Sequence, residues 1–179
     1  MPTARVAPTP LSLAEQVCLA LVVEGVSHGW AIGSLLARTG ELGRIWTLSR
    51  PLTYRAIDSL VERGLVTRAG VESGRGRERS VLASTAAGRR AARAWLDLPV
   101  AHLRDIRTEL LLKLSLRQRV GLPNAPLLEA QIAALEPAVE SLVTQPTETD
   151  LIAQWRYESA SAARRFLEGA LRAEAGKLT

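Results

Sequence analysis

The chain has 179 residues and a mass of 19.3 kDa, which suits one large domain or two small ones. Apolar residues make up 47% and aromatic residues only 4%, a composition that favours packed helices over a β-sandwich and argues against disorder. The lone cysteine, Cys18, excludes an internal disulfide framework, and the two histidines, His28 and His102, exclude most histidine-ligated metal sites. We therefore expect no metal and no cofactor.

The positive charge is concentrated in the first half of the chain. Residues 1–98 contain 13 Lys and Arg against 8 Asp and Glu, whereas residues 99–179 contain 10 of each. Within residues 44–93, 11 arginines face only 4 acidic residues. A basic field of this kind attracts a polyanion, so the segregation favours nucleic-acid binding over an ordinary solvated surface.

No segment of the sequence has the character of a membrane span or an export signal. The longest strongly apolar stretch, Gln16 to Val23, is far shorter than the ~20 residues that a membrane helix needs. The first ten residues hold three prolines and no secretory-type apolar region, which is typical of a flexible arm. We expect a cytoplasmic protein.

Capping signals predict the elements of the first half. Ser12 and Glu15 stand at capping-box spacing, and Ser49 and Thr85 each precede a helix-forming run. The stretch 72–77, rich in Gly and Arg, predicts the turn of a β-hairpin. The predicted elements are helices over 13–24, about 28–40, 51–63 and 86–98, and strands over 65–71 and 78–83.

The second half is predicted to be helical throughout. Helices are expected over 105–120, about 126–143 and about 150–176, and Pro137 predicts a kink or break in the second of them. The last helix would span ~40 Å, longer than a domain of this size needs, and its apolar stripe indicates a partner helix. We predict a flexible arm over 1–10, a DNA-binding domain over 11–98 and a helical dimerisation domain over 99–179.

The order of the elements is that of a mainly α protein with an N-terminal winged helix-turn-helix and an α-helical second domain. In winged helices the third helix enters the major groove and the hairpin tip contacts the backbone or the minor groove. A helical wheel places Thr53 within the buried face and Arg55 opposite it, with Asp58 and Glu62 expected to pair with surface arginines. Arg50 and Arg55 are the best candidates for guanine edges. The predicted DNA-binding residues are Ser49, Arg50, Thr53, Tyr54, Arg55, Arg75, Arg77 and Arg79.

Several segments in this order resemble the PadR family of bacterial transcriptional regulators. They are His28-Gly-Trp-Ala-Ile32, Arg50 to Leu60 running into Gly64-Leu-Val66, the Arg-rich wing and Thr85-Ala-Ala-Gly-Arg89. The neutral second half, with Arg107 to Leu114 near its start, resembles that of longer-tailed members, so the resemblance covers roughly residues 11–176. It implies a homodimer joined through the C-terminal helices and repression of nearby genes, relieved in several members by a small, often aromatic, ligand.

The sequence departs from the family pattern at the start of the third helix. Members commonly have a Gly-Thr-Leu-Tyr type sequence where this chain has Pro51-Leu-Thr-Tyr54. The hydroxyl commonly offered to DNA is therefore expected to be replaced by Leu52. Trp30 and Val81 stand where members often carry Tyr, and both are interpreted as packing substitutions.

Two further sets of residues follow from the resemblance. An aromatic residue in the fourth helix lines a ligand pocket in some PadR-like proteins, which makes Trp95 a candidate ligand contact, although an ordinary packing role is the favoured alternative. The predicted dimer-interface residues are Leu111, Leu114, Trp155 and Phe166.

Three alternatives to a PadR-like regulator differ in what they require of the sequence. An enzyme is disfavoured because no phosphate loop, metal cluster or nucleophile elbow is present in the sequence. A MarR-like winged helix would need a dimer helix from each end of the chain, and the N-terminal arm is too short to supply one. A winged helix that binds protein instead of DNA remains an alternative, although it would not need such a basic segment.

Overall fold

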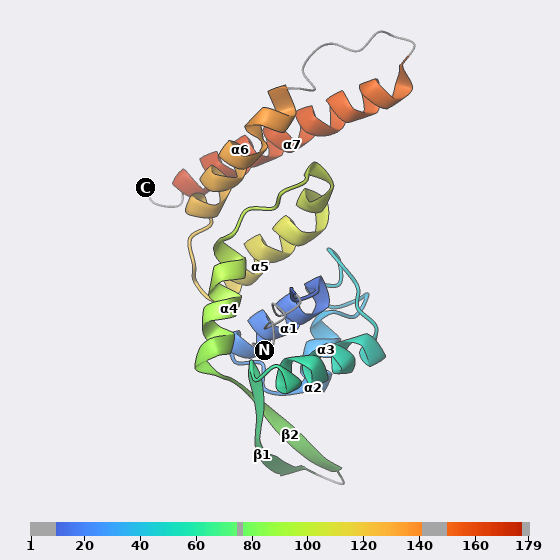
Figure 1. Cartoon of the computed structure of the whole chain (residues 1–179), viewed down its shortest axis with the longest axis vertical. Helices are drawn as coiled ribbons and strands as arrows, with labels where there is room; N and C mark the ends of the chain where they lie inside the picture. The colour runs from blue at the N-terminus through green and yellow to red at the C-terminus, as the bar shows by residue number, and fades with distance from the viewer. Residues whose placement is uncertain (1–9, 75–76, 141–149, 177–179) are drawn as a thin grey trace, which may run out of the picture.

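A computed structural model of the chain describes the backbone of residues 10–74, 77–140 and 150–176, with the side chains of residues 69, 71–74, 77–79 and 138 outside the description. The molecule is elongated, with a two-stranded wing at one end and the α6–α7 pair at the other (Figure 1). The mainly α class predicted from sequence, a winged helix-turn-helix followed by helices, is confirmed. The elements are α1 (Leu13–Glu24), α2 (Gly29–Leu35), α3 (Arg50–Glu62), β1 (Val66–Gly74), β2 (Arg77–Ser84), α4 (Ala86–Asp97), a 3-10 turn (Leu103–Asp105), a π-helical turn (Ile106–Leu110), α5 (Leu111–Arg119), α6 (Ala125–Glu140) and α7 (Leu151–Ala175).

Helix α1 is the centre of the winged-helix unit. Its predicted capping box is present: Ser12 accepts a hydrogen bond from the Glu15 amide, and the Glu15 carboxylate accepts one from the Ser12 amide. The helix contacts α3, α4, α5 and β2, so most of its apolar side chains are buried. Cys18 is among them, and burial raises the pKa of its thiol to about 12. The Leu82 amide in β2 donates to the Ser27 carbonyl at 2.7 Å, which joins the wing to the α1–α2 connection.

The helix α5 lies between two apolar cores. Leu112 and Leu116 pack into the core of the winged-helix unit, and Leu110 and Leu114 pack into a second core formed with α6 and α7. The stretch before α5 is not the continuous α-helix predicted from residue 105, because a 3-10 turn and a π-helical turn precede Leu111. The hydrophobic pattern of the sequence carries no signal for that change of hydrogen-bond register.

Two other predicted boundaries are corrected. Helix α2 ends at Leu35 instead of reaching Gly40, because the Leu35 carbonyl accepts hydrogen bonds from the amides of Leu42 and Gly43. Helix α6 continues through Pro137, so of the predicted kink or break the break is wrong, while the kink stays a prediction. Proline removes the hydrogen bond to the carbonyl four residues earlier, that of Ala133, and the exposure of Ala133 lets water replace the lost donor.

Two buried cations on α5 hold the C-terminal end of α4. The Lys113 ammonium donates to the Leu98 carbonyl at 2.7 Å and lies 2.8 Å from the Glu109 carboxylate. Burial lowers the pKa of Lys113, and the Glu109 carboxylate opposes that shift. The Arg117 guanidinium donates to the Leu96 carbonyl and the Asp97 carboxylate. Cations at this end of α4 complement the helix dipole and satisfy carbonyls that have no intrahelical donor.

Within the described ranges, no single helix is long and apolar enough to cross a membrane. Only α1 and α2 taken together reach that length and apolarity, and they are bent by 114° at their connection.

Candidate nucleic-acid interface

The helix α3 buries one face and presents the other to solvent, as the helical wheel predicted. Ala56, Ile57 and Leu60 are buried in the first core, whereas Arg55 and Tyr54 are exposed. The buried side chains of α3 therefore hold the helix against the core, while its polar side chains are exposed to solvent. This is the arrangement that a helix reading a DNA groove needs.

A buried carboxylate fixes the rotation of α3. Glu15 on α1 accepts a hydrogen bond from the Ser59 hydroxyl at 2.5 Å and lies 3.4 Å from the Arg63 guanidinium, while also accepting from Ser12. Burial alone would raise the pKa of Glu15, but hydrogen bonds from Ser12 and Ser59 and the charge of Arg63 outweigh it and leave the pKa below its ordinary value. The N3 residue of the capping box thus also connects α1 to α3, a tertiary role that its spacing does not reveal.

Two glycines on α2 make room for the side chains at the start of α3. A Cβ atom on Gly29 would lie only 2.8 Å from Cε1 of Tyr54, so the tyrosine ring rests directly on the α2 backbone. A Cβ atom on Gly33 would meet Cγ of Arg50 at an ordinary 3.6 Å. Gly29 therefore orients Tyr54, whereas Gly33 leaves Arg50 room to adjust.

A shallow hollow of about 400 Å³ opens between α2 and the N-terminus of α3. Two arginines and three hydroxyl side chains contribute to its wall, and the N-terminus of α3 lies at its edge. Of the three hydroxyls, that of Ser34 donates to the Trp30 carbonyl at 2.9 Å. Hydroxyls, guanidinium groups and helix N-termini are the usual protein partners of backbone phosphates. The lining residues are Gly33, Ser34, Ala37, Arg38, Thr47, Leu48, Ser49 and Arg50.

The hollow adds residues that sequence reasoning missed. Ser49 and Arg50 were predicted, whereas Ser34, Arg38 and Thr47 were not. Arg38 lies beyond the end of α2 and Thr47 lies in the α2–α3 connection. The available signal was the presence of an arginine and hydroxyls on both sides of that connection, but the spacing could not show that the fold brings them together.

Thr53 is a correction to the predicted contact set. Its side chain is fully buried, and its hydroxyl donates to the Ser49 carbonyl at 3.1 Å. The hydroxyl therefore faces the helix interior and cannot contact DNA in this conformation. The Ser49 side chain makes no capping hydrogen bond, contrary to the prediction, while Pro51 stands in the first turn as expected. Leu52 is 45% exposed and occupies the outer position beside Tyr54.

The wing is a two-stranded antiparallel sheet joined to α3 at its base. Val66 pairs with Ser84, and an irregularity between Arg68 and Val71 shifts the register. The Arg68 guanidinium lies 2.5 Å from the Asp58 carboxylate on α3, which confirms the predicted pairing of Asp58 with a surface arginine. Arg75 lies outside the described residues, as do the side chains of Arg77 and Arg79, so the predicted wing contacts stay predictions.

The residues predicted for ligand and dimer contacts fall into two groups. Trp95 is buried and its indole N–H donates to the Glu109 carboxylate at 2.9 Å, with the Lys113 ammonium 5.1 Å from the ring centroid. Leu114 is buried in the second core of its own chain, and Leu111 is half-buried against that core. The other two predicted interface residues, Trp155 and Phe166 on α7, are exposed.

Comparisons with known proteins found similarity among solved structures and no matching family. No family model matches the chain, and no curated protein matches its sequence. Among solved structures, PadR of Bacillus subtilis in complex with operator DNA is similar, with a TM-score of 0.48 and 17% sequence identity. The similarity covers 95% of this chain and 100% of that one. At this identity the likeness assigns no residue and no partner to this chain.

Proposed function

We propose that this chain is a DNA-binding transcriptional regulator, a repressor of PadR type. The observation that carries the proposal is the N-terminal half of α3, where Tyr54 and Arg55 are exposed and Arg50 lines a hollow that also holds a second arginine and three hydroxyl side chains. The excess of positive charge in the same half of the chain supports the same partner, because a polyanionic duplex gains from it.

In the proposed complex the two kinds of contact have different tasks. The hollow between α2 and α3 holds backbone phosphates and sets the register of α3 on the duplex. Arg55, on the outward face of α3, reads a base edge in the major groove, with Arg50 beside it. Asp58 is neutralised by Arg68 and does not oppose the phosphates.

The proposal includes a homodimer that reads an inverted repeat. Two recognition helices one DNA turn apart, ~34 Å, require a two-fold pair of protomers. The exposed apolar side chains of α7 support pairing through the second half of the chain, with Trp155 as the central contact. Release by a small aromatic effector is also part of the proposal. An effector at Trp95 would have to displace side chains that now pack against it.

The base-reading role of Arg55 is tested by one substitution and one matched control. Arg55→Ala should cost ~1–3 kcal/mol on the specific duplex and much less on random duplex. Arg165→Ala removes the same charge from an exposed position on α7 and should leave both affinities nearly unchanged. Fluorescence anisotropy with a duplex selected from random sequence by the wild-type protein provides the readout.

Two outcomes would contradict the proposal. Equal losses on specific and random duplex would make Arg55 a phosphate contact and remove the base-reading role. Failure to select any sequence, together with an affinity insensitive to salt, would favour the alternative of a winged helix that binds another protein.

A further inference from the structure

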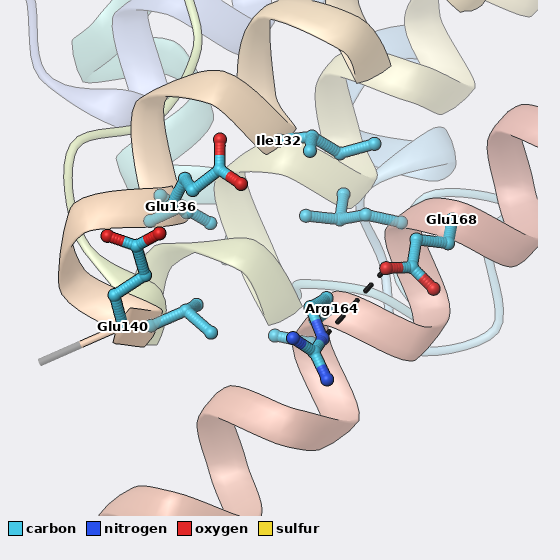
Figure 2. Close-up of a pocket in the computed structure, with 9 residues that line it drawn as sticks. Ile132, Glu136, Glu140, Arg164 and Glu168 are labelled. Carbon is cyan, nitrogen blue, oxygen red and sulfur yellow. Dashed lines mark ion pairs between the residues drawn. The ribbon is translucent and has the colours of Figure 1, made fainter. Parts of the chain in front are cut away.

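A cavity of about 330 Å³ lies between α6 and α7, at the opposite end of the molecule from the wing (Figures 1 and 2). Its floor is apolar: Leu135 and Val139 of α6 and Leu167 of α7 are buried members of the second core. Ile132 and Ala163 complete the apolar wall and are half-buried. The floor therefore offers a preformed apolar surface that the chain's own described side chains do not fill.

The rim of the cavity carries an excess of negative charge. Glu136 and Glu140 stand one turn apart on α6, and Arg164 and Glu168 stand one turn apart on α7 (Figure 2). Arg164 is the one cation among the lining residues, and it lies 3.9 Å from Glu168 with both side chains about half exposed. That ion pair is long and solvated, so it neutralises Glu168 without compensating the two glutamates across the cavity.

The two glutamates on α6 are placed unfavourably for the helix itself. Like charges at i and i+4 repel one another on a helix surface. Both also lie toward the C-terminal end of α6, where the helix dipole disfavours negative charge, and the last turn of α6 as described holds no basic residue. A positive charge between Glu136 and Glu140 would relieve both effects.

We propose that this cavity binds a small organic cation with an apolar body, of the aryl-alkylamine class. The ammonium group lies between the carboxylates of Glu136 and Glu140, and the apolar body rests on Leu135, Val139 and Leu167. The volume is at the lower end of the range for small-molecule sites, roughly 300–1,000 Å³, which limits the ligand to about one or two rings. This proposal does not rest on DNA binding, because the site shares no residue with α3 and its occupancy is measured directly.

Isothermal titration of the full chain with three probes tests the charge requirement. Phenylbutylamine, phenylbutanol and phenylpentanoate share one phenylbutyl body and differ only in a cationic, neutral or anionic end. We expect the amine to bind once per chain and the alcohol to bind about tenfold more weakly, since hydrogen bonds to charged groups contribute ~1.5–3 kcal/mol. The carboxylate should bind more weakly still.

Substitutions on the rim test the location. The double variant Glu136→Gln with Glu140→Gln should weaken the amine about tenfold and leave the alcohol unchanged, because only the charge is removed. Glu129→Gln is the matched control, since Glu129 is exposed on α6 and does not line the cavity. Arg164→Gln should tighten amine binding, because it removes the opposing cation and frees Glu168. Thermal unfolding of each variant checks that it is folded.

Several results would overturn the proposal. Equal binding of amine and alcohol, or amine binding that survives the double substitution, would show that the glutamates do not select a cation. Absence of amine binding to wild-type protein would also overturn it. If the double substitution instead alters the sedimentation behaviour without any effect of amine, the cavity is a contact between copies of the chain and not a ligand site.

Discussion

The two ends of the molecule differ in what they leave exposed. At the winged-helix end, the start of α3 exposes mainly arginine, serine and tyrosine above a packed apolar core. At the other end, α7 leaves Leu151, Ile152 and Trp155 between 73% and 75% exposed. One surface suits a charged polymer, whereas the other suits an apolar partner. The same chain therefore has two surfaces that suit different kinds of partner. The buried cations of α5 connect the two ends that carry them.

The largest expected effect on the free energy of unfolding comes from removing one of these buried cations, Arg117. Arg117→Ala removes a buried guanidinium that bonds the Leu96 and Pro123 carbonyls and the Asp97 carboxylate, which should cost about 3 kcal/mol of unfolding free energy because the buried Leu96 carbonyl loses a charged donor. The matched control is Arg93→Ala, because Arg93 pairs with the same Asp97 from an exposed position and should cost less than about 1 kcal/mol. Urea unfolding measures both, and equal losses would contradict a junction role for Arg117.

The next effect tests the apolar end alone. Trp155→Ser should weaken self-association by at least about 2 kcal/mol, close to thirtyfold, because exposed aromatic anchors dominate interfaces. Leu98→Ser is the control, since Leu98 is also largely exposed but lies at the end of α4. Sedimentation equilibrium gives the dissociation constants. Unchanged association of the Trp155 variant would show that α7 does not form the contact between copies.

A pH dependence tests the winged-helix end alone. The pKa of Glu15 is lowered from its ordinary 4.5, so its contribution to stability is present at neutral pH and is lost as the pH falls through the folded-state value. Glu15→Gln should cost about 1–2 kcal/mol at neutral pH and flatten the acid limb of the stability profile. Urea midpoints measured from pH 3 to 7 would reveal it, and parallel profiles for variant and wild type would argue against this role.

The smallest effects distinguish two glycines on one helix. Gly33→Ala places its Cβ at an ordinary distance from Arg50 and should stabilise the fold by about 0.5–1 kcal/mol through helix propensity. Gly29→Ala collides with the Tyr54 ring, so it should weaken DNA affinity severalfold as Tyr54 shifts. Anisotropy and thermal unfolding separate the two, and loss of DNA affinity from Gly33→Ala alone would reverse the assignment.

Local signals predicted the winged-helix end well. The Ser12–Glu15 capping box, the Thr85 cap and the buried face of α3 are all present, because each depends on residues within a few positions of one another. The same wheel that correctly buried Thr53 also shows why it fails as a DNA contact.

Features that depend on distant segments could not be predicted from sequence. Lys113 and Arg117 have the pattern of solvated helix charges, yet both are buried because α4 ends against them. The hollow at the start of α3 is lined by Arg38 and Thr47, which the α2–α3 connection brings to the same place. The cavity between α6 and α7 requires two helices to face each other, which no local pattern encodes.

Whether the basic end of the molecule reads DNA can be measured with a salt series on two duplexes. The purified chain is titrated into a labelled fragment from immediately upstream of its own coding sequence and into a random duplex of equal length. We expect much tighter binding to the upstream fragment, with affinity for both falling steeply as salt rises because counterions are released from neutralised phosphates. Weak binding that is equal on both duplexes and insensitive to salt would contradict it.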